Sequence, residues 1–201
     1  MTRLYLTRHG ETEWNLEGRM QGSNNSNLTS KGIEQAIRLG KWLENTHFDA
    51  VYSSSSGRAI QTAELIVRQR DLPIVPVDEL KEMNFGIWEG QTFDDIREKY
   101  NEQYQCFWNT PHLLKDFPGE TFEECKTRVV SAITKIVNQN EDKDILVVAH
   151  ALALKVILSY FENTPLDKLF DNRILQPTSL SVVEVNNNEF QIIKYGSTEH
   201  Y

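Results

Sequence analysis

Ile145-Leu146-Val147-Val148-Ala149-His150 is an apolar run, without a polar interruption, that ends on a histidine. A strand with one exposed face alternates apolar and polar residues, whereas a strand covered on both faces is apolar throughout. The run therefore predicts a buried strand of the kind found in parallel sheets enclosed by helices, and it places His150 at the carboxyl end of that strand.

Short apolar runs and helical patterns alternate on both sides of this segment. The further predicted strands are Thr2–Leu6, Phe48–Tyr52 and Ile74–Val77, with a closing hairpin of Leu180–Val185 and Phe190–Tyr195 around Asn186-Asn187-Asn188. The predicted helices are one that begins after the N-cap Thr29, Gly57–Arg68, Leu152–Tyr160, and one that opens on the capping box Thr121-x-x-Glu124 and runs to Val137. This order predicts an α/β fold, a three-layer α/β/α sandwich on a mostly parallel central sheet with an antiparallel piece at its end.

Length and composition suit one globular domain over residues 1–201, with a helical excursion around residues 91–120. The formal net charge of -8 argues against nucleic acid or an anionic membrane as a partner, because either would require a broad basic face. Cys106 and Cys125 show no disulfide framework, and the first residues lack the apolar run of a secretory signal. We therefore expect a cytoplasmic protein, and the oligomeric state stays open.

Three predicted strands carry basic side chains to one edge of the sheet. The first strand runs into Arg8 and His9, the second leads to Arg58, and the apolar run ends on His150. Ligands of open α/β sheets bind just beyond the carboxyl ends of the strands. We therefore expect two arginines and two histidines to share one site.

Such a group of residues is suited to phosphoryl transfer. Arginine matches phosphate oxygens with a planar charged fork, and a neutral imidazole can attack phosphorus. A leaving alkoxide also needs a proton, for which Glu82 is the natural donor. Spacing alone leaves Glu11, Glu13 and Glu89 as rivals. The five histidines show no metal-ligand spacing, and no nucleotide-cofactor motif is present, so we expect neither metal nor cofactor.

The segment Leu6-Thr7-Arg8-His9-Gly10-Glu11-Thr12 resembles the signature of the histidine phosphatase superfamily, also called the phosphoglycerate mutase-like family. Later segments follow in the family's order from Leu4 to Ser181. They are Trp14-Asn15, Gly18 to Gly22, Leu28 to Gly32, Ser53 to Thr62, Leu80-Lys81-Glu82, Gly86 to Gly90, Pro118-Gly119-Glu120 and Val147 to His150.

The resemblance implies a phosphoglycerate mutase-like fold and a role for each matching residue. His9 would be the phosphorylated nucleophile and Glu82 the proton donor, with Arg8, Arg58 and His150 completing the phosphate pocket. The remaining substrate-binding positions would be Asn15, the backbone at Gln21 and Gly22, and the backbone N–H of Ala151. A phosphohistidine would form on His9 and water would then release the phosphate, without a metal ion.

Three departures from the family's pattern bear on the substrate. Ala151 and Leu152 replace the usual Gly-Gly, Asn25 and Asn27 stand where Asp and Pro are frequent, and the usual Asn is replaced around Pro177-Thr178. Leu152 could narrow the site.

We expect a phosphatase that acts on a small phosphorylated molecule. A phosphoglycerate mutase is an alternative, although the segment from Tyr100 to Phe117 contains only Lys115 and His112 to hold a second acidic group. A binding protein without catalysis is a third reading. In the same segment Phe107 and Trp108 are expected either to pack in the core or, with Trp14 and Met20, to form a wall of the pocket that favours aromatic esters.

Overall fold

The computed structural model describes residues 1–115, 117–171, 174–187 and 189–201. Asn188, which belongs to the predicted closing turn, lies outside these residues. Within them, six strands form one sheet: β1 (Thr2–Arg8), β2 (Ala50–Ser54), β3 (Ile74–Val77), β4 (Asp144–Ala149), β5 (Leu180–Asn186) and β6 (Glu189–Ser197).

The strand order is β3-β2-β4-β1-β5-β6, with the predicted apolar run at the centre as β4. Strands β3, β2, β4 and β1 are parallel, whereas β5 and β6 add an antiparallel edge. The register places Arg8 opposite Ala149, so β1 and β4 end at the same level. The predicted mostly parallel sheet with an antiparallel end is therefore confirmed.

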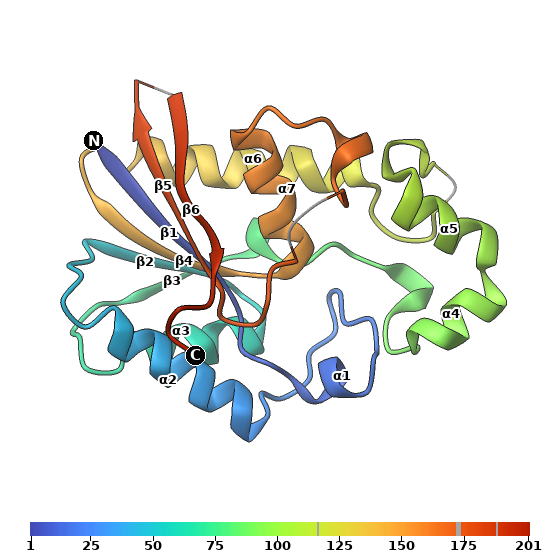
Figure 1. Ribbon diagram of the computed structural model, residues 1–201, viewed down its shortest axis with the longest axis horizontal. Helices are drawn as coiled ribbons and strands as arrows, with labels where there is room; N and C mark the ends of the chain where they lie inside the picture. The colour runs from blue at the N-terminus through green and yellow to red at the C-terminus, as the bar shows by residue number, and fades with distance from the viewer. Residues whose placement is uncertain (116, 172–173, 188) are drawn as a thin grey trace.

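Seven α-helices occur in the described residues: α1 (Glu13–Leu16), α2 (Ser30–Trp42), α3 (Gly57–Val67), α4 (Phe93–Lys99), α5 (Asn101–Asn109), α6 (Phe122–Asn138) and α7 (Ala151–Phe161). Helices α2 and α3 cover one face of the sheet and α6 and α7 cover the other, while α4 and α5 project to one side (Figure 1). Among the described residues, no helix has the length and apolar character needed to cross a membrane.

Alternation along the central strands separates two apolar cores. Leu4 and Leu6 belong to the core beneath α6 and α7, whereas Tyr5 between them belongs to the core beneath α2 and α3. Strand β4 divides in the same way, with Val147 on the first side and Val148 on the second. Each face of the sheet is thus covered by helices, as an apolar strand requires.

Two caps confirm the predicted helix starts. Thr29 accepts a hydrogen bond from the backbone of Gly32, and Thr121 forms a complete capping box with Glu124. The predicted bounds of the second strand were wrong by two residues, since β2 spans Ala50–Ser54. Reciprocal bonds join Asp49 to Asp144 just before the strand begins, and its two terminal serines continue the ladder with β3.

Candidate active site

His9 lies directly after β1 and is 3% exposed. Its backbone N–H donates to Ala149 O at 3.0 Å, which extends the ladder with β4 by one residue. The backbone N–H of Gly10 donates to Thr62 Oγ1 at 3.0 Å. A Cβ on Gly10 would stand 2.5 Å from the carbonyl oxygen of Gly32, so only glycine allows α2 to approach this closely.

The hydrogen bonds of His9 determine which ring nitrogen carries the proton. Nδ1 lies 2.7 Å from Gly10 O, and a carbonyl oxygen can only accept, so the proton resides on Nδ1. Nε2 therefore presents its lone pair, and Arg58 Nε–H donates to it at 3.3 Å. Burial, followed by the positive charges of Arg58 and Arg8, holds the pKa of His9 well below 6.5. The imidazole is thus neutral at physiological pH.

Arg58 stands in the first turn of α3, is 1% exposed, and connects His9 to the loop of residues 22–25. Its Nη2 donates to Gly22 O at 2.9 Å and its Nη1 donates to Asn24 O at 2.6 Å. Asn25 Oδ1 accepts from the Arg58 backbone at 3.0 Å. Burial lowers the pKa of Arg58 to about 10, so the guanidinium remains charged. Asn25, one of the departures from the family pattern, therefore helps to hold this arginine.

His150 is the N-cap residue of α7 and is fully buried. Its ring stands edge-on to that of His9, with centroids 5.2 Å apart. Its Nε2 lies 2.7 Å from Ser54 Oγ. Burial, followed by the positive charges of Arg58 and Arg8, holds the pKa of His150 well below 6.5. Ser54 is a site residue that the sequence analysis did not single out; its place at the end of β2 was the available signal.

Two nitrogens of the site are buried without a partner among the described residues: Arg8 Nε and His150 Nδ1. Arg8 uses its Nη1 to donate to Leu175 O at 2.9 Å, and burial lowers its pKa. Buried polar atoms in native proteins nearly always have partners, so the two orphaned nitrogens indicate a polar ligand. A phosphoryl group has this character.

Glu82 is 8% exposed and its carboxylate lies against the start of α7. Oε2 accepts from Leu152 N at 3.1 Å and Oε1 accepts from Ala153 N at 3.0 Å. The His150 side chain makes no capping bond, so Glu82 performs this function from a distant loop. The structure thus brings Glu82 to the residues directly after His150.

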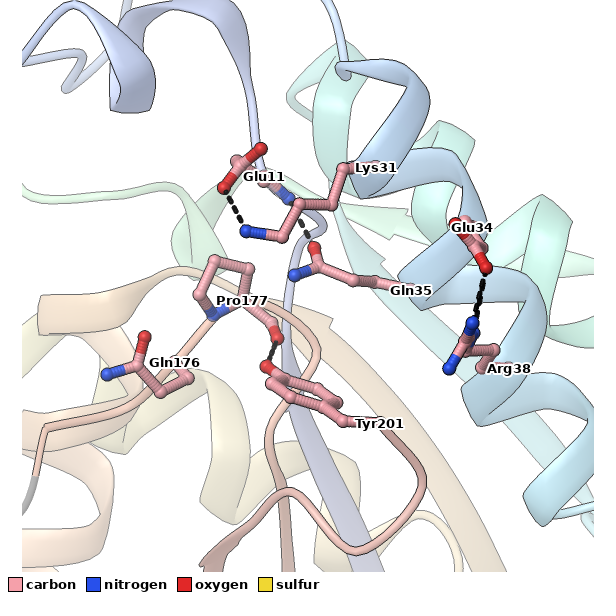
Figure 2. Close-up of a pocket in the computed structure, with 8 residues that line it drawn as sticks. All are labelled: Glu11, Lys31, Glu34, Gln35, Arg38, Gln176, Pro177 and Tyr201. Carbon is pink, nitrogen blue, oxygen red and sulfur yellow. Dashed lines mark hydrogen bonds and ion pairs between the residues drawn. The ribbon is translucent and has the colours of Figure 1, made fainter.

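The three rival glutamates are engaged elsewhere. Glu11 pairs with Lys31 on α2 at 3.0 Å (Figure 2), and Glu13 is exposed. Glu89 accepts from the backbone of Ser23. Of the four carboxylates, Glu82 is the one that lies beside a site histidine.

The expected substrate-binding positions lie in the loop after β1 and at the start of α7. Asn15 Oδ1 accepts from Thr12 Oγ1 at 3.0 Å, and Gln21 Nε2 donates to the same hydroxyl at 2.7 Å. The backbone N–H groups of Gln21, Gly22 and Ala151 have no partner within the described parts of the chain. These three amides are available to a ligand.

The other two departures from the family pattern also have a structural account. Ala151 is the first residue of α7 and has no positive φ, so its Cβ causes no strain. The Leu152 side chain belongs to the core beneath α6 and α7. Thr178, in the segment where the usual Asn is replaced, adopts φ 56°, and its N–H donates to Arg8 O at 3.0 Å.

The proposal that Phe107 forms a pocket wall is wrong. Its side chain is fully buried and contacts the rings of six other aromatic residues: Phe85, Trp88, Trp108, Phe117, Phe122 and Phe170. Met20 lies in the same core. Aromatic composition did not distinguish the two readings, because ring packing and a pocket wall require the same residue types.

The chain is similar to known proteins over nearly its whole length. A model of the histidine phosphatase superfamily (branch 1) matches residues 4–198. The solved structure of Bacillus stearothermophilus YhfR is 42% identical, covers 100% of this chain and 99% of that chain, and has a TM-score of 0.97. The adenosylcobalamin/alpha-ribazole phosphatase of Escherichia coli is 33% identical over 92% of this chain and 90% of that protein.

The fold is also similar to the crystal structure of phosphoglycerate mutase from Bacillus anthracis. That structure is 27% identical, covers 99% of this chain and 94% of that chain, and has a TM-score of 0.88. The predicted phosphoglycerate mutase-like fold is therefore confirmed.

Proposed function

Since this chain belongs to the histidine phosphatase superfamily, as its sequence motifs indicated, we propose that it hydrolyses small organic phosphomonoesters through a phosphohistidine on His9. The observation that carries the proposal is the state of His9. Its Nε2 holds a lone pair beside a guanidinium, in a site where buried nitrogens of Arg8 and His150 lack partners.

In the first step His9 Nε2 attacks phosphorus and the bond to the ester oxygen breaks. Arg8, Arg58 and His150 stabilise the charge on the equatorial oxygens, together with the open amides of Gly22 and Ala151. The leaving oxygen takes a proton from the Glu82 carboxyl group.

In the second step a water molecule attacks the phosphohistidine. Glu82, now ionised, accepts a proton from that water, and the bond between phosphorus and His9 Nε2 breaks. Inorganic phosphate and the starting enzyme result. Each cycle therefore begins and ends with a proton on the Glu82 carboxyl group.

We expect the reaction to proceed without a metal ion. Among the described residues, no group of three or more His, Cys, Asp or Glu side chains has a metal-binding arrangement. Positive charge from the arginines takes the place that a cation occupies in other phosphoryl-transfer sites. We place the enzyme in the cytoplasm, acting on a small phosphorylated substrate and not on nucleic acid or a membrane.

The test is phosphate release in EDTA from p-nitrophenyl phosphate, 3-phosphoglycerate, fructose bisphosphates and nucleoside monophosphates. Wild type should release phosphate and His9→Ala should not. The exposed His47, which bonds to Asp49, provides the matched control, and His47→Ala should retain activity. Equal release by wild type and His9→Ala would contradict the proposal. Isomerisation of 3-phosphoglycerate without release would indicate a mutase instead, and a folded protein that binds phosphate without release would indicate a binding protein.

A further inference from the structure

Four consecutive residues of the loop after α1 offer their backbone amides in two different states. The N–H groups of Gln21 and Gly22 have no partner within the described residues, whereas those of Ser23 and Asn24 both donate to Glu89. The Asn24 N–H also donates to Gln21 O at 3.1 Å. The distances are 2.8 Å from Ser23 N to Oε1 and 3.2 Å from Asn24 N to Oε2. The Glu89 carboxylate thus binds two of the four backbone N–H groups of this loop.

Glu89 is held firmly in this position. Its Oε1 also accepts from Phe85 N at 3.1 Å, so three backbone amides converge on one carboxylate. A Cβ on Gly22 would stand 2.1 Å from Glu89 Oε1, and glycine at φ 58° is what permits the contact.

Hydrogen bonds fix the backbone of this loop through both its carbonyl oxygens and its amides. Arg58 donates to the carbonyl oxygens of Gly22 and Asn24. Glu89 accepts from the amides of Ser23 and Asn24. Burial lowers the pKa of Arg58, and the negative charges of Glu82 and, more weakly, Glu89 oppose that lowering. The loop amides therefore cannot turn toward a second anion without losing their bonds to Glu89.

The groove beside Glu82 has the same electrostatic character. It has a volume of about 600 Å³ and includes Ser23, the residue held by Glu89. Its charged lining residues are Asp78, Lys81, Glu82, Glu120, Glu124 and Arg128. Both cations are already paired, Lys81 with Asp78 at 2.8 Å and Arg128 with Glu120 at 2.6 Å. Acids outnumber bases, so the groove repels an anionic leaving group.

We infer that the site accepts phosphomonoesters whose leaving group is neutral or cationic, and that Glu89 determines this by occupying the amides that would bind a second anion. The inference rests on the proposed phosphatase function. It narrows the expected substrates of that function to phosphorylated alcohols and amino alcohols, as opposed to phosphorylated hydroxy acids. Glu89 is a positioning residue in this account, because it acts through the loop and not on the reacting atoms.

Two matched pairs of esters test the inference, each differing by one carboxylate. They are phosphoethanolamine against phosphoserine, and glycerol 3-phosphate against 3-phosphoglycerate, with p-nitrophenyl phosphate as the reference. For wild type, kcat/KM should favour the member without a carboxylate by about tenfold or more, because like charges face each other at short range. Added salt should narrow the preference.

Glu89→Gln should reduce the ratio of kcat/KM between the two members of each pair. It should do so by lowering KM for the member that carries the carboxylate. A variant that merely loosens the loop would affect both members of a pair alike and leave their ratio unchanged. Glu64→Gln, an equal change of charge at an exposed position of α3, is the control and should leave the ratio as in wild type.

The outcomes separate the two proposals. Hydrolysis of p-nitrophenyl phosphate that depends on His9, combined with a preference for the carboxylate-bearing esters or a ratio unchanged by Glu89→Gln, overturns the inference and leaves the phosphatase function standing. Absence of release from every ester by folded protein overturns both.

Discussion

Arg58 Nε lies 3.3 Å from His9 Nε2, on the side of the ring opposite the bond between Nδ1 and Gly10 O. The imidazole is therefore held at both nitrogens, with its lone pair directed at a permanent cation. A phosphoryl group that reaches Nε2 meets the guanidinium at the same point. One arginine thus orients His9 and, together with burial, lowers its pKa; in the proposed mechanism it also supplies charge for the transferred group.

Arg58→Lys should lower kcat/KM for p-nitrophenyl phosphate by about 10²-fold or more, since a preorganised donor at the developing charge is lost. Lysine has a single nitrogen and cannot reach His9, Gly22 and Asn24 together. Arg38→Lys, at an exposed arginine that pairs with Glu34, is the matched control. If Arg58→Lys kept activity within twofold of wild type, the guanidinium bonds to His9, Gly22 and Asn24 would not be needed for activity.

Glu82→Gln should impair esters of aliphatic alcohols more than p-nitrophenyl phosphate. An alkoxide needs a proton to leave and p-nitrophenolate does not, and general acid catalysis contributes about 10²- to 10⁴-fold. Glu79→Gln, at an exposed position three residues earlier, is the control. Equal losses on both kinds of ester would remove Glu82 from the role of proton donor.

Glu82→Ala should also lower the free energy of unfolding, by about 1–2 kcal/mol, because the first amides of α7 lose their cap. Urea unfolding monitored by circular dichroism measures the change. Glu82→Gln, which keeps one acceptor oxygen, should be less destabilised than Glu82→Ala. The reverse order would show that the cap contributes nothing.

Stability should fall as pH drops below about 6.5. Burial, with the nearby arginines, lowers the folded-state pKa of both His9 and His150, whereas the unfolded chain titrates near 6.5. Below that pH the two histidines are protonated in the unfolded state but remain neutral in the folded state. Each histidine therefore lowers the free energy of unfolding by up to about 1.4 kcal/mol per pH unit. Above about pH 6.5 the two histidines are neutral in both the folded and the unfolded state, so they contribute no pH dependence to the stability.

Urea unfolding at several pH values between 8 and 5 measures this slope. His150→Gln should show a shallower loss of stability at acid pH than wild type. The same slope in the two proteins would mean that other groups account for the acid sensitivity. The control is His47→Gln, an exposed histidine outside the site, which should retain the wild-type slope.

Phe107→Ala should cost about 3–5 kcal/mol of stability, as expected for removal of a buried aromatic side chain. The ranking of phosphoesters should not change, because the ring lies in the core and not at the pocket surface. Phe107→Leu should cost less and permits the kinetic comparison if the alanine variant is too unstable. A changed ranking with Phe107→Leu would restore the pocket-wall interpretation.

Much of the fold follows from local patterns in the sequence. The apolar run of β4 requires cover on both faces, the box of Thr121 and Glu124 begins α6, and alternation of strands and helices requires a parallel sheet. The strand ends then place His9 and His150 at one edge. These features depend on residues near one another in the chain, which is why a single sequence is enough to predict them.

Only the tertiary structure decided the parts that rest on distant residues. Glu82 reaches the α7 amides across 70 residues, Asn25 meets Arg58 across 33, and Glu89 meets Ser23 across 66. Such contacts are made by loops, which have no periodicity to read and whose paths depend on the packing of the elements they join. The sequence therefore determined the sheet, its edge and the place of His9 at that edge, whereas the packing of loops decided which carboxylate faces α7, which aromatic ring is core, and which amides remain without a partner.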